Sequence, residues 1–195
     1  MERNTTVAVV GGGAAGLTAA LFLARAGIAV EVFDHDRSTL KRAWLANLPG
    51  TDGMEGLALL AQLRASVANG TVVLTSAKVD DVAVNDAGFA VQCGADEILC
   101  RYVILATGQG TLKLASLAVE TTSARQPFVK VNVVTDRWGA TSVPGVWAAG
   151  VIAGWPSQAV ICAGSAAAVA VEIASAINGE FWVDHEDTRT PTDQA

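Results

Sequence analysis

The hydrophobic pattern of this chain begins with a short run of apolar residues. Residues 7–10 are all apolar and three of them are valine, which is typical of a strand buried on both faces. An Ala-rich apolar stretch follows at residues 17–26, and Gly27 comes where an α-helix would end. A second apolar strand is predicted at residues 29–33. This strand–helix–strand order is the unit from which parallel sheets are built.

Beyond these elements the hydrophobic period changes twice. Residues 54–68 carry apolar positions at helical spacing, and residues 71–75 form a short β-branched strand. Apolar and polar residues then alternate over residues 78–101, which predicts an inserted antiparallel β-meander. Residues 102–106 are again continuously apolar and predict a buried strand.

The last part of the pattern is more irregular. Residues 109–126 are loop-like, and residues 128–134 predict another strand. A turn and a last central strand are expected within residues 143–150, before a helix at 157–178 that Gly179 closes. The pattern as a whole predicts an α/β fold, a Rossmann-like three-layer domain with a parallel central sheet.

Composition sets the domain count and excludes some partners. The chain has 195 residues, 51% of them hydrophobic, which suits a single folded domain over residues 1–183 with a polar, disordered tail at 184–195. The net charge of −6 and the lack of a basic cluster argue against nucleic acid. The apolar stretch 159–177 is rich in Ala, Gly and Ser, which favours a buried helix over a membrane span.

The cysteines and the N-terminus add an expected location. The 3 cysteines fit no metal-ligand spacing and form no C-x-x-C motif. This spacing predicts no metal site. No signal-like segment precedes the first strand, and the few cysteines suit a reducing compartment, so a cytoplasmic protein is expected.

Three glycines after the first strand predict a nucleotide site. Gly11, Gly13 and Gly16 have G-x-G-x-x-G spacing, which serves a tight turn, close approach of a pyrophosphate and close helix–strand packing respectively. Asp34 follows the second strand, where such folds place a carboxylate that accepts hydrogen bonds from ribose hydroxyls. The alternative is a unit whose glycines serve packing alone. The combination favours a dinucleotide site.

Three separated stretches, residues 7–34, 103–108 and 141–163, resemble the FAD-binding domain of the thioredoxin reductases and related pyridine nucleotide–disulfide oxidoreductases. Within and beside them, four short motifs are similar to motifs of that family, namely Asn47-Leu-Pro-Gly50, Ala106-Thr107-Gly108, the segment 142–150 and Gln158-Ala159. The resemblance implies that FAD is the cofactor. With the glycine motif it implies these contacts: Gly11, Gly13, Ala14, Ala15, Gly16, Asp34, His35, Asn47, Val79, Ala106, Thr107, Gly108, Gly150, Val151, Gln158 and Ala159.

The chain departs from that family in two ways. The family inserts a complete nicotinamide-binding domain, usually with a redox C-x-x-C, where this chain has only residues 109–126. The resemblance therefore implies an external electron donor or redox partner protein. The family also has Asp where this chain has Val151, which removes a hydrogen-bond acceptor for a ribityl hydroxyl and costs roughly 1.5–3 kcal/mol of binding.

Candidate chemistry is sparse. If FAD binds, the N-terminus of the helix near Ser157 would face the flavin and favour negative charge on it; the alternative is that Ser157 only caps a core helix. Cys162, one turn into that helix, is a weak catalytic candidate whose thiolate the helix dipole would favour, and a small core residue is the alternative. A turn at Ala95-Asp96 would make Cys93 and Cys100 diagonal neighbours about 7–8 Å apart, too far for a disulfide.

Three functions stay open at this point. The favoured one is an FAD-dependent oxidoreductase of thioredoxin reductase type that uses an external donor. The second is a dinucleotide-binding subunit or sensor without turnover. The third is a protein that binds NAD(P) in place of FAD. NAD is then favoured over NADP, because Asp34 would repel the 2′-phosphate of NADP. An exposed flavin face also predicts a homodimer.

Overall fold

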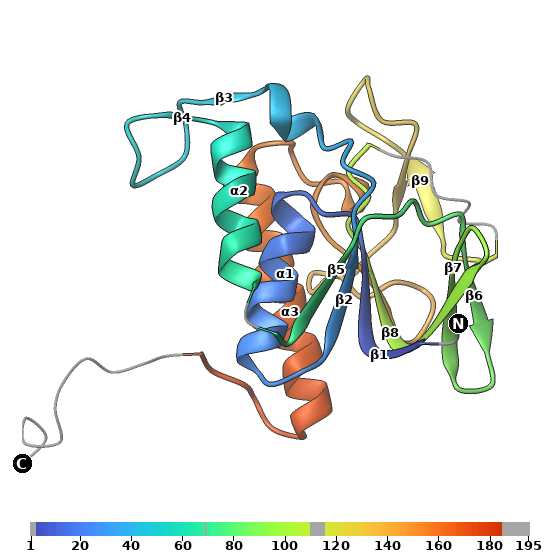
Figure 1. Cartoon of the computed structure of the whole chain (residues 1–195). Coiled ribbons are helices and arrows are strands. Elements are labelled where there is room, and N and C mark those ends of the chain that lie inside the picture. Colours follow the sequence, from blue (N-terminus) through green and yellow to red (C-terminus); the bar gives the residue numbers. More distant parts are fainter. Residues whose placement is uncertain (1–2, 69, 110–115, 185–195) are drawn as a thin grey trace, which may run out of the picture.

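A seven-stranded mixed sheet forms the middle of the molecule (Figure 1). The computed structural model describes residues 3–68, 70–109 and 116–184. Along the sheet the strand order is β5-β2-β1-β8-β7-β6, and β11 pairs with β8. The strands β1, β2, β5, β8 and β11 pair in parallel, whereas β7 is antiparallel to β8 and β6 is antiparallel to β7. The strands of this sheet are β1 (Arg3–Val10), β2 (Val30–Phe33), β5 (Val72–Thr75), β6 (Asp81–Asn85), β7 (Gly88–Cys93), β8 (Asp96–Leu105) and β11 (Val146–Ala148).

Three α-helices cover one face of the sheet (Figure 1). The helices α1 (Ala14–Arg25) and α3 (Ala159–Asn178) pack against each other, and α2 (Gly56–Val67) packs against α1. Side chains alternate across the central strand, so Val7 and Val9 enter this helical core while Ala8 and Val10 point to the opposite face. The continuous apolar run at the start of the chain therefore fills two cores.

The second core lies under the antiparallel hairpin and the last connections. It contains Val82, Phe89 and Val91 from the hairpin, together with Val103 and Leu105 from β8. Two small two-stranded sheets lie outside the main one. Their strands are β3 (Trp44–Leu45) with β4 (Met54–Glu55), and β9 (Thr121–Ser123) with β10 (Val131–Val133). The remaining elements are the 3₁₀ helices η1 (Thr39–Arg42) and η2 (Gly150–Ala153).

The predicted three-layer α/β fold is confirmed, but one strand boundary was wrong. The third strand of the meander and the apolar strand after it are a single ten-residue strand, β8. Its first half pairs with β7 and its second half with β11, so the neighbouring strand on this side changes halfway along. The change from alternating to continuous apolar residues marks this change of neighbouring strand and not the boundary between two strands.

Two further expectations require correction. The segment 109–126, predicted as loop, contains the short strand β9, which is exposed and has no apolar residue to signal it. The hairpin turn lies at Gly94-Ala95, because Cys93 pairs with Asp96 and Phe89 with Cys100. Cys93 and Cys100 are therefore four register positions apart, about 13 Å along the strands at roughly 3.3 Å per residue. Both are buried and neither forms a disulfide, and burial raises the pKa of Cys100 to about 12.

One helix in the described part of the chain, α3, is long and apolar enough to cross a membrane by length and composition. Core helices of water-soluble proteins pass the same test, and α3 is packed against α1. Its buried side chains include Ala166, Ala170 and Ala174, which are small enough to let α1 approach closely. The predicted tail at 184–195, apart from Asp184, lies outside the described residues.

Candidate dinucleotide-binding site

The glycine-rich loop connects the carboxyl end of β1 to α1. Gly11 has φ +116°, and a Cβ atom built on it would lie 2.3 Å from the carbonyl oxygen of Ala106. A Cβ on Gly16 would lie 1.8 Å from the carbonyl oxygen of Gly11. The loop therefore packs directly on the end of β8 and on α1, which only glycine permits at these two positions. At Gly13 the nearest atom is the Ser38 Oγ at 3.5 Å, so the space beside this residue is open.

The first turn of α1 has no side-chain cap. Its N-cap is Gly13, no side chain accepts a hydrogen bond there, and no acidic residue lies in the first turn. The first N–H groups of a helix have no partner within the helix, and they carry the positive end of its dipole. Gly13, Ala14 and Ala15 all line one cavity, so a ligand bound there can accept hydrogen bonds from these N–H groups.

The N-terminus of α3 repeats this arrangement. Its N-cap is Gln158, with no side-chain capping bond and no acidic residue in the first turn. Ser157 was predicted as a possible cap, but the structure gives the helix no side-chain capping bond.

A cavity of about 310 Å³ lies between these two helix N-termini. Among the residues that the structure describes, its lining contains no Asp, Glu, Lys or Arg. An anion there would be held by backbone N–H groups, helix dipoles and neutral polar side chains, without a charged side chain. The lining consists of Gly13, Ala14, Ala15, Ser38, Thr39, Leu40, Ala43, Leu45, Asn47, Ala106, Gly108, Gln109, Ala149, Val151, Ser157, Gln158, Ala159 and Cys162.

The turn after β11 brings Val151 to the cavity and is fixed from two sides. The Gly150 N–H donates to the Ser165 Oγ at 3.0 Å. The buried Asn132 side chain donates through Nδ2 to the carbonyl oxygen of Val151 at 2.8 Å. Gly150, with φ +70°, lies against α1, since a Cβ there would be 3.0 Å from the Ala15 Cβ. Val151 therefore adds an apolar patch to the wall in a rigid turn.

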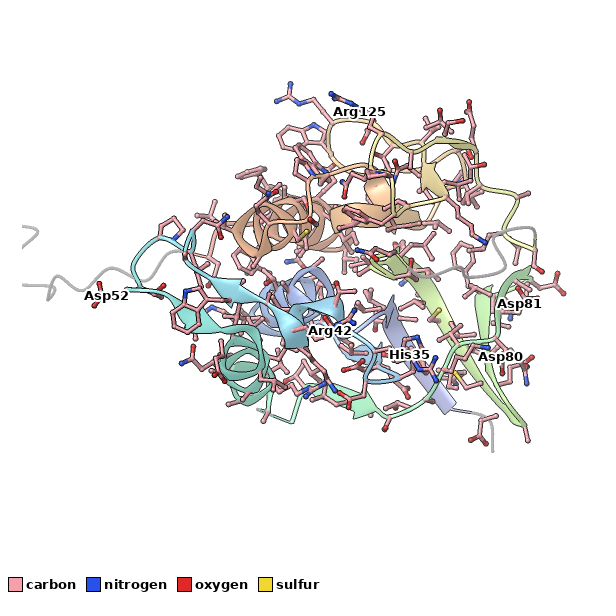
Figure 2. The ribbon with its side chains drawn as sticks, turned by 90° about the horizontal axis from the view of Figure 1, so that it is seen from above. His35, Arg42, Asp52, Asp80, Asp81 and Arg125 are labelled. Carbon is pink, nitrogen blue, oxygen red and sulfur yellow. The ribbon has the colours of Figure 1, made fainter. Side chains whose placement is uncertain are left out.

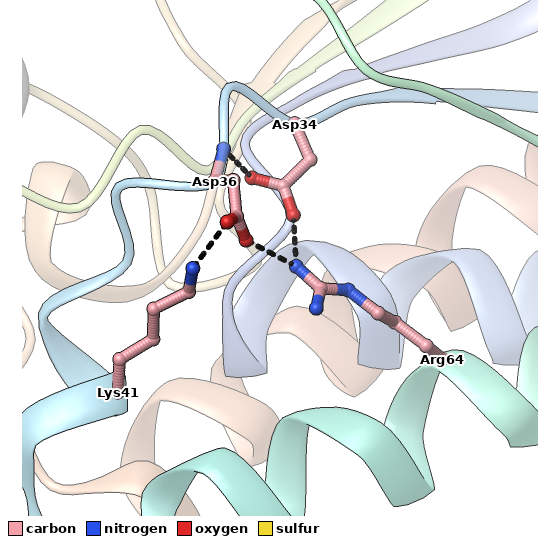
Figure 3. A network of polar contacts seen from close by, with 4 residues as sticks. All are labelled: Asp34, Asp36, Lys41 and Arg64. Carbon is pink, nitrogen blue, oxygen red and sulfur yellow. Dashed lines mark hydrogen bonds and ion pairs between the residues drawn. The ribbon is translucent and has the colours of Figure 1, made fainter.

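Asp34 lies beside the glycine loop in a network of four charged side chains (Figure 3). Its Oδ2 accepts a hydrogen bond from Arg64 Nη2 at 2.7 Å, and its Oδ1 accepts one from the Asp36 N–H at 2.8 Å. Arg64 Nη2 also donates to Asp36 Oδ1 at 2.9 Å, and Lys41 forms an ion pair with Asp36.

The remaining predicted contacts do not line the cavity. His35 is exposed in the loop after β2 (Figure 2). Val79 is buried in the second core. Thr107 lies in the turn after β8, between two lining residues, and Gly150 lies behind the wall that Val151 forms.

Cys162 lies in the cavity wall, but its environment does not favour a thiolate. Burial raises the pKa of its thiol, which outweighs the helix dipole that was expected to lower it. The thiol donates to the Pro156 carbonyl oxygen at 3.4 Å. The cavity can therefore bind and orient a ligand, but its described lining offers no side chain suited to acid–base or nucleophilic chemistry near neutral pH.

Several residues of the site were not predicted from the sequence. Arg64 and Asn132 reach it from distant elements, and only the topology brings them there. A weak signal existed for Asn132, an amide within an otherwise apolar strand. Arg64 resembles any solvated arginine on an amphipathic helix, so it gave no signal.

Comparison with known proteins identifies this arrangement. The sequence matches the pyridine nucleotide-disulphide oxidoreductase family over residues 5–125. The chain belongs to this family. It is 29% identical over 121 residues to an NADPH-dependent thioredoxin reductase 3 of Arabidopsis thaliana, covering 58% of this chain and 23% of that protein. It is also 26% identical over 119 residues to a ferredoxin–NADP reductase of Lactobacillus helveticus, covering 57% of this chain and 37% of that protein.

Solved structures give the same fold. A thioredoxin reductase from Gloeobacter violaceus superposes with a TM-score of 0.78 and 19% identity, covering 95% of this chain and 99% of that chain. An oxidoreductase from Agrobacterium tumefaciens gives a TM-score of 0.81 and 16% identity, covering 91% and 100% of the two chains. Because the match to each curated relative spans well under half of that protein's length, the activities of those relatives do not transfer as a whole.

Proposed function

We propose that this chain binds FAD across the carboxyl ends of β1, β2, β8 and β11, and that it acts as a flavin-dependent oxidoreductase supplied with electrons by a separate donor. The observation that carries this proposal is the convergence of two uncapped helix N-termini on one uncharged cavity. Such a cavity suits a ligand that combines anionic groups with a large apolar ring system.

The residues present fit most of this ligand. The glycine loop and the first turn of α1 would hold the pyrophosphate, and Asp34 would accept hydrogen bonds from the adenosine ribose. Asn47, Gly108 and Gln109 would surround the ring system near α3. Val151 fits less well, because a valine side chain offers no acceptor to the polyol, and this lowers the expected affinity by roughly one to two decades.

Bound FAD supplies reversible transfer of one or two electrons. The chain contributes orientation and electrostatics to that chemistry. The uncapped N-terminus of α3 favours negative charge at the edge of the ring that it faces. The apolar residues Ala106, Ala149 and Val151 exclude water from the inner wall, which strengthens the effect of those dipoles.

The proposal of an external donor is supported by the connection between β8 and β9. Only residues 106–120 join these strands, too few for a second nucleotide-binding domain, and the sequence holds a single G-x-G-x-x-G motif. This supports the proposed external donor, which would be another protein or a diffusing reductant.

A second candidate function is a flavin-binding subunit or sensor without turnover. It is favoured by the absence of acid–base groups in the described cavity lining and of a C-x-x-C motif in the sequence. It shares the FAD site with the main proposal, and only redox cycling separates the two.

The test is a titration of the purified chain with FAD, followed by visible absorption and fluorescence. Saturable binding supports the proposal, and a chain that takes up no FAD at micromolar concentrations contradicts it. Anaerobic reduction by dithionite, reduced ferredoxin or NADPH, followed by reoxidation, then separates the two candidates. A bound flavin that no protein or small-molecule donor reduces would favour the sensor.

A further inference from the structure

The charged network at the end of β2 joins two elements that are distant in the sequence. Asp34 and Asp36 follow β2, Lys41 lies in η1, and Arg64 reaches across from α2 (Figure 3). Arg64 uses one nitrogen, Nη2, to donate to both carboxylates. Its side chain is 36% exposed and that of Asp34 is 17% exposed, so this contact is better shielded from water than an ordinary surface ion pair.

The network holds the Asp34 carboxylate in one orientation. Arg64 binds one carboxylate oxygen, and the Asp36 N–H binds the other. The carboxylate packs closely against the glycine loop, since a Cβ built on Gly12 would be 2.4 Å from the Asp34 Cγ. A carboxylate oxygen has two lone pairs, so each oxygen can accept one further hydrogen bond.

The network also balances charge beside a site for an anionic ligand. Two carboxylates without their cations would repel a pyrophosphate held at the neighbouring helix N-terminus. Arg64 and Lys41 provide two positive charges in direct contact with them. Lys41 first and Arg64 second lower the pKa of Asp36, and Asp34 raises that of Arg64, as mutual stabilisation requires.

We propose that Arg64 is a positioning residue for the adenosine half of the cofactor, which it serves by aiming Asp34 at the ribose hydroxyls and cancelling its charge. This inference rests on the proposed FAD site. It gives the two halves of the cofactor different requirements: the adenosine half depends on Arg64, and the flavin half does not, because no atom of Arg64 lines the cavity.

Three probes separate these requirements in the full-length chain. FAD has both halves, FMN has only the flavin half, and ADP has only the adenosine half with its pyrophosphate. Arg64→Gln is expected to weaken binding of FAD and ADP about tenfold, as for loss of a charge-assisted contact, and to change FMN binding less than about twofold. Unchanged FMN affinity also shows that the variant is folded.

Two further variants serve as controls. Lys41→Gln removes the same charge but contacts only Asp36, so it is expected to weaken FAD and ADP binding by less than about threefold. Arg64→Lys keeps the charge but places its single donor nitrogen on a shorter side chain, so it should recover part of the loss.

The outcomes are distinct. Equal weakening of FAD and FMN by Arg64→Gln would mean a general structural role, and unchanged or tighter FAD binding would mean that Arg64 does nothing for the ribose or competes with it. Each of these results overturns the inference. A wild-type chain that binds ADP but no flavin contradicts the proposed function, while the ADP result still tests Arg64. A chain that binds none of the probes refutes both.

Discussion

The two ends of the candidate site differ in charge: one has an uncharged lining and the other is a network of charged side chains. At the cavity end, the two helix N-termini and the lining present backbone N–H groups with apolar and neutral polar side chains, and no carboxylate or cation among the described residues. At the Asp34 end, four charged side chains from three parts of the chain neutralise one another. A pyrophosphate and an aromatic ring can be held by dipoles and apolar walls, whereas ribose hydroxyls require an oriented acceptor. The difference separates what backbone geometry can provide from what side chains must provide.

The largest expected effect is that of Gly11→Ala, which would disrupt the glycine loop at the cavity end. The new methyl group would meet the Ala106 carbonyl oxygen in an unfavourable φ region, so we expect a destabilisation of at least about 3 kcal/mol and loss of FAD binding. Chemical denaturation measures the first effect and fluorescence titration the second. Gly27→Ala is the matched control, because Gly27 also has positive φ but no atom lies within 4 Å of its Cβ position. It should cost only about 1–2 kcal/mol. Equal costs for the two variants would refute the close contact.

The two ends also differ in how pH acts on them. Burial raises the pKa of Cys162, so its contribution to stability is complete below the unfolded pKa of about 8.5 and is lost as pH rises above it. Asp36 behaves in the opposite way, because Lys41 and Arg64 lower its pKa. Its contribution is complete above about pH 4 and is lost at lower pH.

Denaturation curves of the wild type and two variants test this contrast. Between pH 8.5 and 10 the wild type should lose up to about 1.4 kcal/mol per pH unit more than Cys162→Ala. Asp36→Asn should differ from the wild type in slope only below about pH 4. A pH slope of Cys162→Ala identical to that of the wild type would contradict the burial of this thiol.

At the cavity end, Val151→Asp should restore an acceptor for the polyol. We expect FAD binding to tighten about tenfold, the lower part of the range for a charge-assisted hydrogen bond, because the new carboxylate must also be desolvated. Val151→Asn supplies an acceptor without the charge and should give a smaller gain. Weaker FAD binding by Val151→Asp, with Val151→Asn unchanged, would show that this wall does not face the polyol.

The smallest expected effect has opposite signs for stability and binding. Gln158→Asp would cap α3 and stabilise the free chain by about 0.5–1 kcal/mol, while its charge would weaken FAD binding roughly two- to fivefold. Gln158→Asn caps the helix without a charge and should keep FAD affinity. Thermal unfolding and flavin titration of both variants check these signs. Tighter FAD binding by the aspartate variant would exclude an anion at this helix end.

The sequence pattern predicted the fold and most of the residues at the cavity end. The glycine spacing placed Gly11 and Gly16 at the two contacts that no other residue permits, and periodicity located all three helices. It failed where pairing partners changed along one strand, as in β8, and where a strand had no buried face, as in β9. Cys162 was only a weak catalytic candidate, and the structure favours the alternative of a small core residue, because burial raises the pKa of its thiol.

What the sequence determined by itself is the local geometry: a strand, a glycine turn and a helix whose first N–H groups lack a cap. These depend on residues close together in the chain, so spacing alone reveals them. Only the tertiary structure decided which side chains meet at the ribose end, because Arg64 lies 30 positions from Asp34 and reaches it by the packing of α2 on α1. Spacing carries no information on a contact that depends on how two elements pack, and for this reason the charged network could not be predicted.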